Sequence, residues 1–398
     1  MTAPVFALGD RSLFPALQAQ AYLAYAATAP ASSLVKAAVN RVVDSYAERG
    51  NIAFLDWVEQ RERLREKLGQ LIGAQGSDIA LTSGTTRAIS DLALSLPWRR
   101  GDRVVLFEGE FPANVSPWQR AAELFDLRID FVPMANAVED EDSFVAPLTQ
   151  LLERGPRLVA VSAVQFQTGL KMPLARIAKL CAHYGAELAV DAIQACGVVP
   201  LDVRALGVDY LVTGAHKWLL GPEGAGFVYA RPERARALMP RTAGWLSHEE
   251  GTRFLFAGPG ELRYDRPLKS GLQMLEGGSC SSLGFAALEA GIAPLLALSP
   301  AVIFEHVTEY LNRLEPGVVA RGFRSRRARE PERRSAILSF QPPAGVSATD
   351  LVTELRARGV AASMPDGLLR FAPHFPSALS EIETVLAALD DALAKLRA

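Results

Sequence analysis

The sequence predicts an α/β fold in which a large domain with a mostly parallel sheet precedes a smaller α+β domain. Across residues 79–229, short apolar runs alternate with stretches of helical periodicity, which is typical of parallel strands joined by helices on both faces of a sheet. Beyond residue 229 this alternation ends in a loop-rich tract. We therefore expect three parts: an N-terminal segment (1–28) that belongs to the small domain, a large domain (29–285) and a C-terminal small domain (286–398).

Composition supports a globular protein that acts on a small metabolite. The chain has 398 residues, of which 49% are hydrophobic, enough for a large core. Its 42 basic and 44 acidic residues nearly cancel, so we expect neither nucleic acid nor a membrane as partner. No apolar run reaches the roughly 18 residues of a membrane span, and the first ten residues lack the basic and then apolar pattern of a secretory signal peptide. We therefore expect a cytoplasmic protein. Three cysteines without CxxC spacing predict reduced thiols and no metal site.

The first elements are a strand with a close turn at 21–30, two amphipathic helices at 32–49 and 56–72, and a short strand at 79–81. That strand runs into the small polar residues 82–86, and a helical pattern follows from Arg87. A strand, a polar turn and a helix together direct backbone N–H groups and hydroxyls at an anion, with help from the helix dipole. A phosphate site is one interpretation, and an ordinary N-capped helix is the alternative.

Two further strands place candidate side chains at their C-terminal ends. The strand at 103–107 leads to Phe111, whose ring can lie on a flat ligand and gain about 0.5–1.5 kcal/mol by offset stacking. The strand at 158–162 leads to Gln165 and Gln167, either of which is a candidate to bond a cofactor or substrate. A solvated loop amide is the alternative for each.

An acid and a lysine follow two neighbouring strands. The apolar run 186–190 ends at Asp191, and the run 210–212 leads to Lys217 and then to the glycine-rich 221–226. Each residue alone could be a turn residue or a surface amine. Together they lie where open α/β sheets bind ligands. A lysine amine that binds an aldehyde covalently, with an acid that keeps a ring nitrogen protonated, predicts pyridoxal phosphate as the cofactor.

The same residues carry a family resemblance. The DxxQ motif at Asp191–Gln194, the His216-Lys217 pair and the GPxGxG stretch resemble the lysine-bearing signature of the class V aminotransferase superfamily, which includes cysteine desulfurases, kynureninase and isopenicillin N epimerase. The resemblance covers nearly the whole chain from Tyr22. It implies a pyridoxal phosphate-dependent transferase of fold type I, an α-amino-acid substrate and a homodimer.

The resemblance also implies roles for single residues. Lys217 holds the cofactor and serves as base for the α-proton, Asp191 binds the pyridinium, and Gln194 bonds the ring hydroxyl. Phe111 stacks on the ring. The implied phosphate ligands are Gly84, Thr85, Thr86, His216 and, from the partner subunit, Ser279. In the LRFAPHF stretch, Arg370 grips the substrate α-carboxylate as a planar fork, and Gln165 is a candidate second substrate contact.

This chain departs from its relatives at three places. Phe111 stands where desulfurases carry a histidine. Gly214 stands where many relatives have a serine, so Thr213 or backbone N–H groups are expected to replace it. The loop at 360–365 lacks the desulfurase cysteine, so we predict no persulfide-forming activity. We predict an aminotransferase first, a β-eliminating lyase (such as a C–S lyase) or an amino-acid epimerase as alternatives, and a non-catalytic regulator as the distant one. The substrate stays open.

The C-terminal part predicts helices at 283–298, 301–314 and 348–358, a strand at 336–340 and a last helix from about residue 377. The tract 321–334 is dense in arginine and glutamate with little apolar content. We expect it to be a solvated loop.

Overall fold

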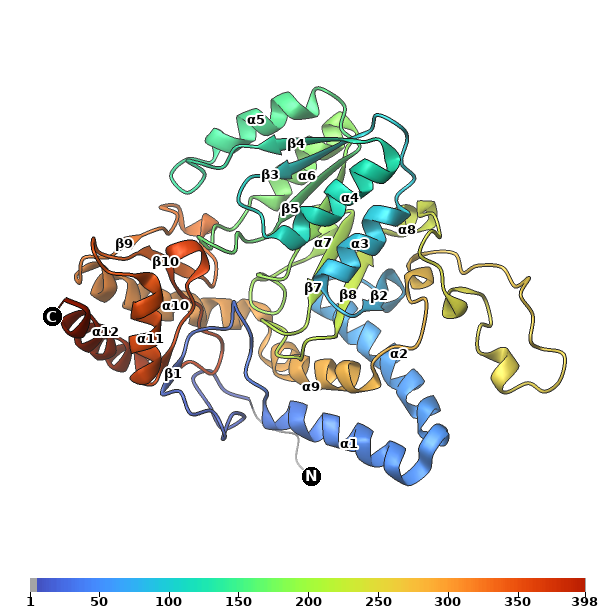
Figure 1. The fold of residues 1–398 in the computed structure, drawn as a ribbon, viewed down its shortest axis with the longest axis horizontal. Helices are drawn as coiled ribbons and strands as arrows, with labels where there is room; N and C mark the ends of the chain where they lie inside the picture. The colour runs from blue at the N-terminus through green and yellow to red at the C-terminus, as the bar shows by residue number, and fades with distance from the viewer. Residues whose placement is uncertain (1–5, 398) are drawn as a thin grey trace.

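The computed structural model describes residues 6–397. Its centre is a seven-stranded sheet of order β2-β8-β7-β6-β5-β3-β4, in which β8 runs antiparallel to both neighbours and all other neighbouring pairs are parallel (Figure 1). The predicted α/β fold with a mostly parallel sheet is confirmed. The strands are β2 (Ile79–Thr82), β3 (Arg103–Phe107), β4 (Arg128–Val132), β5 (Leu158–Ser162), β6 (Glu187–Asp191), β7 (Tyr210–Gly214) and β8 (Gly226–Ala230). We had not predicted β4, an edge strand whose charged, exposed residues hide its pattern.

Helices cover both faces of this sheet because successive strand side chains point to opposite sides. Val105 and Phe107 face one core, which includes α5 and α6, whereas Val104 and Leu106 face the other, which includes α3 and α4. The helices of this part are α1 (Ser33–Arg49), α2 (Ala53–Ile72), α3 (Thr85–Ser95), α4 (Ser116–Phe125), α5 (Asp142–Leu152), α6 (Leu174–Tyr184), α7 (Val203–Leu206) and α8 (Pro232–Ala237). The sheet is thus buried on both faces, and ligands can reach it only at the ends of its strands.

A smaller group of elements packs beside the sheet. A three-stranded antiparallel sheet of order β12-β10-β9 lies with the C-terminal helices. These elements are α9 (Ser282–Leu298), α10 (Pro300–Val319), β9 (Arg324–Ser325), β10 (Leu338–Gln341), α11 (Ala348–Ala357), β11 (Val360–Ala361), β12 (Leu369–Phe371) and α12 (Glu381–Arg397). The N-terminal strand β1 (Ala21–Tyr22) pairs in parallel with β11, so segments far apart in sequence lie side by side (Figure 1). The domain boundaries stay a prediction.

The arginine-rich tract at 321–334 is only partly a solvated loop, because residues 329–332 are exposed but two of its arginines are buried. Arg327 is buried and donates to Asn312 (2.7 Å) and Glu315 (2.9 Å) of α10. Arg333 is buried and donates to the carbonyl of Ala137 in the large domain. Arginine can be buried when distant residues supply acceptors, and those acceptors were not visible in the local charge pattern.

Within residues 6–397, no single helix is long and apolar enough to cross a membrane. Only α9 and α10 taken together pass that test, and they bend by 80° at their junction. Between α8 and α9, the loop-rich segment shown in yellow in Figure 1 extends away from the body of the molecule.

Candidate active site

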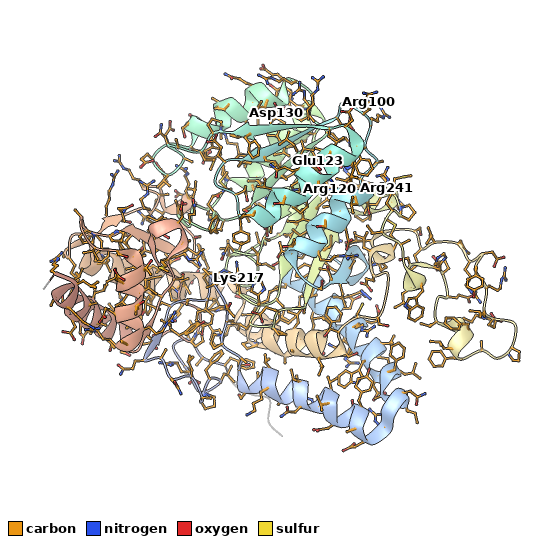
Figure 2. All side chains as sticks on the ribbon, in the orientation of Figure 1. Arg100, Arg120, Glu123, Asp130, Lys217 and Arg241 are labelled. Atoms are coloured by element: carbon orange, nitrogen blue, oxygen red, sulfur yellow. The ribbon has the colours of Figure 1, made fainter. Side chains whose placement is uncertain are left out.

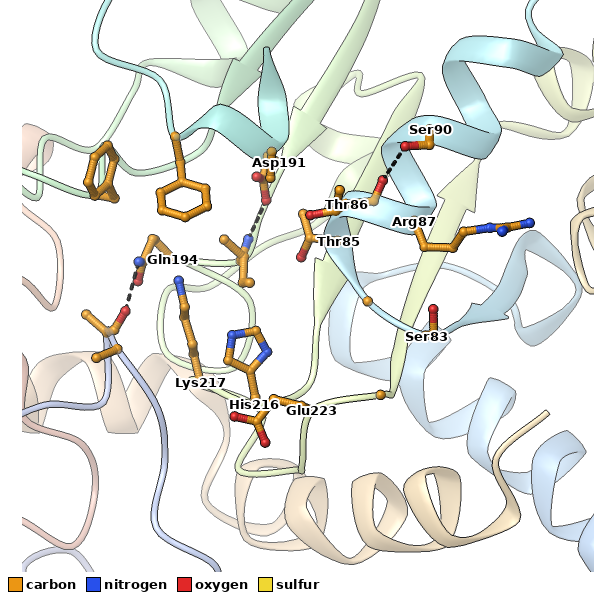
Figure 3. Close-up of a pocket in the computed structure, with 18 of the residues that line it drawn as sticks. Ser83, Thr85, Thr86, Arg87, Ser90, Asp191, Gln194, His216, Lys217 and Glu223 are labelled. Atoms are coloured by element: carbon orange, nitrogen blue, oxygen red, sulfur yellow. Dashed lines mark hydrogen bonds between the residues drawn. The ribbon is translucent and has the colours of Figure 1, made fainter. Parts of the chain in front are cut away.

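A cavity of about 1010 Å³ opens at the C-terminal ends of the parallel strands (Figure 3). This is the edge at which the sequence predicted a ligand. The cavity wall contains nine of the predicted residues: Gly84, Thr85, Thr86, Phe111, Asp191, Gln194, His216, Lys217 and Arg370. These residues come from four strand ends and from β12.

Asp191 and Lys217 perturb each other across this cavity. Asp191 is buried at the end of β6 and accepts a hydrogen bond from the Ile193 N–H at 2.9 Å. Burial raises the pKa of Asp191 to about 7, Glu110 adds to this, and Lys217 opposes it. Lys217 follows β7, and burial together with the charge of Arg370 lowers the pKa of its amine to about 8. An amine with a lowered pKa is more often neutral near pH 7, as a nucleophile or base must be.

The amide of Gln194 is locked in one orientation. Its oxygen accepts from the Trp218 indole N–H at 2.9 Å, and its nitrogen donates to the Ala26 carbonyl at 3.0 Å. An indole can only donate, so the amide oxygen must face Trp218 and the NH₂ must face the other way. Gln194 lines the cavity, and its second amide N–H is left to donate to a ligand there.

The N-terminus of α3 forms a cradle for an anion. Gly84 precedes the helix with φ +147°, and the first helical hydrogen bond joins Ala88 N–H to Gly84 C=O. The N–H groups of Thr85, Thr86 and Arg87 therefore have no acceptor inside the helix. The Thr85 hydroxyl is buried and has no hydrogen-bond partner within residues 6–397. An orphaned hydroxyl beside free N–H groups at a positive helix end fits a phosphate.

Gly214 keeps this cradle open. A Cβ at this position would lie 3.1 Å from the Thr85 hydroxyl and 3.3 Å from His216 Nδ1. Thr213, which we expected to replace the missing serine, is buried and does not line the cavity. Position 214 therefore contributes no hydroxyl to the cradle. The N–H groups at the start of α3 are the donors that remain for an anion.

Arg370 places a guanidinium in the cavity wall without a carboxylate partner. Its Nε donates to the Ser363 hydroxyl at 2.9 Å, and Nη1 donates to the Phe166 carbonyl at 2.7 Å. Its Nη2 has no partner among the described residues. Burial lowers the pKa of Arg370 to about 10, so the group is still charged at neutral pH. A buried cation held by neutral acceptors is poised to bind an anion.

Comparison with known proteins identifies the family. Residues 21–368 match the family model described as Aminotransferase class-V. The chain belongs to this family. It is 32% identical over 329 residues to a probable cysteine desulfurase of Chlamydia trachomatis, covering 81% of this chain and 76% of that one. It is 30% identical to an uncharacterized aminotransferase, YcbU, of Bacillus subtilis, covering 58% of this chain and 61% of that one.

Solved structures share the fold. The cysteine desulfurase CsdA of Escherichia coli has a TM-score of 0.83 and 25% identity, with 97% of this chain and 98% of that chain covered. The cystine C–S lyase C-DES, solved with cysteine persulfide, has a TM-score of 0.86, covering 95% and 99% of the two chains. Its identity is 22%, so it supports the fold alone. The family match over most of the chain makes this protein a pyridoxal phosphate-dependent enzyme of class V, and the solved structures share its fold type I architecture.

Two predicted site residues do not line the main cavity. Gln165 is buried and donates to Glu110 at 3.2 Å, so its amide is turned away from the cavity. Ser279 lies in a second cavity of about 340 Å³, which shares Ser83 and Arg87 with the main one. Its predicted role as a phosphate ligand in the partner subunit stays a prediction.

Glu110 is a buried carboxylate that the sequence analysis missed. It accepts from the Ser162 N–H at 2.7 Å, from the Ser162 hydroxyl, and at 3.2 Å from the amides of Asn114 and Gln165. All of these groups donate, which satisfies an ionised carboxylate, although burial raises the pKa of Glu110. Ser162 pairs with Asp191 in the β5–β6 register, so Glu110 lies close to Asp191. The only signal in sequence was an acid beside Phe111.

Phe166 is a second missed residue. Its ring meets Phe111 edge to face, with centroids 5.3 Å apart and planes at 87°. Lys217 Nζ lies 5.7 Å from the Phe111 centroid. No local pattern marked Phe166, because only the fold brings it to the cavity beside Phe111 and Arg370.

Proposed function

We propose that this class V enzyme is an aminotransferase that moves a proton at Cα of an α-amino acid with one base, Lys217. The observation that carries the proposal is the pairing of Lys217 with Phe111 across the cavity. The amine can take and return a proton, whereas a phenyl ring cannot. Epimerisation needs a proton donor on each face of Cα, so this wall disfavours it.

The remaining residues would bind and orient. We propose that Asp191 and Gln194 hold the ring of pyridoxal phosphate and that the α3 N-terminus, with Thr85 and His216, holds its phosphate. When bound, this cofactor withdraws electrons from Cα, which makes the α-proton acidic. Nη2 of Arg370 would bind the α-carboxylate and thereby set the orientation of Cα toward Lys217. Transamination requires no further side chain, because one base can remove the proton and deliver it on the same face.

A second candidate is β-elimination of a sulfur substituent, favoured by the relatives named cysteine desulfurase. It uses the same base. Transfer of sulfur to a cysteine is disfavoured, because the three thiols lie outside the main cavity wall. Burial raises the pKa of the Cys181 and Cys196 thiols to about 12, so neither is a thiolate near pH 7.

The test incubates the holoenzyme with L-amino acids, with and without an added 2-keto acid, and measures the keto acid, ammonia, sulfide and D-amino acid formed. Keto acid that depends on an amino-group acceptor supports transamination. Ammonia and sulfide without an acceptor would establish elimination instead, and racemised substrate would contradict the one-base assignment. Lys217→Ala should abolish the products, whereas Lys171→Ala, which changes a half-buried lysine outside this cavity, should not.

A further inference from the structure

Arg370 lines the cavity together with five apolar residues that we call its apolar end: Ala26, Ala27, Phe111, Phe166 and Pro365. Two polar side chains border this end: Gln194 donates to the Ala26 carbonyl, and Lys217 Nζ lies 5.7 Å from the Phe111 centroid. The Phe166 carbonyl accepts from Arg370 Nη1 at 2.7 Å, so the Phe166 backbone directly supports the proposed carboxylate clamp. A side chain that leaves Cα of a bound amino acid would therefore emerge beside the two phenyl rings.

Charged groups in the wall are already engaged or lie elsewhere. Arg87 and Asp91 of α3 pair with each other at 2.7 Å. Figure 3 shows Arg87 on the side of the cavity away from Lys217. Glu223 lies beside His216 in the same view. Of the charged groups in the cavity wall, Arg370 and Lys217 lie near the phenyl rings. The α-carboxylate would occupy Arg370, and Lys217 is the proposed base.

Asp366 is the acid nearest in sequence to this apolar end, next to Pro365. It is exposed, does not line the cavity, and accepts from the Gln167 amide at 3.0 Å. Among residues 6–397, a cationic substrate side chain would thus find no carboxylate at the apolar end. An anionic one would find Arg370, which the α-carboxylate would occupy, and Lys217. The phenyl rings, of which Phe111 is 46% exposed, offer neither charge a hydrogen bond.

We propose that the protein selects α-amino acids with uncharged apolar side chains and that Phe111 and Phe166 set this selectivity. This rests on the proposed function, because it takes Arg370 as the carboxylate clamp. Edge-to-face packing holds the two rings as one wall, so an aromatic or branched aliphatic side chain gains burial there. Phe166 is the better probe, since Phe111 also faces Lys217.

The test uses binding, so that it does not depend on turnover. Apoprotein is titrated calorimetrically with reduced phosphopyridoxyl adducts of L-leucine, L-asparagine and L-aspartate, which differ little in size, and with the adduct of L-phenylalanine. We expect the leucine adduct to bind roughly 100-fold more tightly than the aspartate adduct, because the two phenyl rings replace water around the side chain and offer a carboxylate no hydrogen bond. The asparagine adduct should fall between them.

Two variants assign the selectivity to a residue. Phe166→Ala should reduce the preference for the phenylalanine adduct over an alanine adduct by roughly tenfold. Phe131→Ala, which removes an exposed ring on the edge strand β4, should change nothing. Equal or tighter binding of the aspartate adduct, or an unchanged preference in Phe166→Ala, would overturn the proposal.

These outcomes are distinct from failure of the proposed function. If the apolar adducts bind selectively but no amino acid yields a keto acid, the selectivity stands and transamination is wrong. If transamination occurs and the charged amino acids react best, the reaction stands and the selectivity is wrong. Absence of binding by every adduct would overturn both.

Discussion

Replacing Asp191 by asparagine should stabilise the protein without cofactor in a pH-dependent way. The carboxyl is 2% exposed, and its pKa rises from 3.8 to about 7 in the folded protein. Below pH 3.8 the Asp191 carboxyl is protonated in both the folded and the unfolded state, so its ionisation does not change the free energy of unfolding. As the pH rises toward 7, the unfolded state loses the proton while the folded state keeps it, so the wild-type protein loses stability.

The size of the effect follows from the two pKa values. Each pH unit between them costs the wild-type protein about 1.4 kcal/mol, or about 4 kcal/mol over the whole interval. An asparagine keeps the hydrogen bond from the Ile193 N–H but does not titrate. The free energy of unfolding of Asp191→Asn, relative to wild type, should therefore rise by about 2 kcal/mol between about pH 5 and pH 6.5. It should then level off above pH 7.

Urea unfolding of the two apoproteins at several pH values measures this difference. Asp44→Asn, which changes an exposed carboxylate on α1, is the control and should show no such trend. Added pyridoxal phosphate should stabilise wild type more than Asp191→Asn, because only wild type offers the protonated ring nitrogen a carboxylate. A stability difference that does not vary with pH would refute the reasoning and mean that Asp191 is well solvated.

Four further predictions concern the site. Borohydride reduction of the holoenzyme and peptide mapping should place the pyridoxyl label on Lys217; a label on Lys171 would contradict the assignment. Arg370→Ala should raise KM and lower kcat/KM for the true substrate, with a loss of transition-state stabilisation on the order of 2–5 kcal/mol, since a buried charge pair is lost; unchanged steady-state kinetics would place the carboxylate elsewhere. In Glu110→Gln the loss of a neighbouring negative charge should lower the pKa of Asp191 toward its unfolded value, so the fall in apoprotein stability with rising pH should be smaller and should level off at a lower pH than in wild type; an unshifted unfolding profile would show that Glu110 does not act on Asp191. With L-cysteine, mass spectrometry should find no catalytic persulfide on Cys280, and loss of both persulfide and alanine formation in Cys280→Ser would reverse this.

Several candidate site residues could be placed together from the sequence because they follow strands directly. Asp191 ends β6 and Lys217 comes three residues after β7, and parallel neighbouring strands must bring such residues to one edge. Thr85 and Thr86 begin a helix after β2, which aims their N–H groups at that edge as well. In each case local periodicity located the element, and the parallel sheet topology brought the residues that follow the strands to the same end of the sheet.

Side-chain direction and long-range contacts could not be predicted in this way. Gln165 was proposed as a substrate contact, but it faces Glu110 because the turn after β5 points its amide inward. Arg327 was expected in solvent, but α10 supplies acceptors that bury it. Both expectations interpreted a polar residue by its neighbours in sequence, whereas its hydrogen-bond partners are set by packing.

The sequence by itself determined the α/β class, the family, the cofactor and the set of polar residues at the strand ends, because these depend on periodicity and short motifs. Only the tertiary structure decided what surrounds them. Phe166 and Arg370 are 204 residues apart and meet through one hydrogen bond, and Glu110 reaches Ser162 across 52 residues. Such contacts depend on how separate elements pack, and no local pattern encodes them, so the apolar end of the cavity and the buried carboxylate beside Asp191 emerge only in the folded chain.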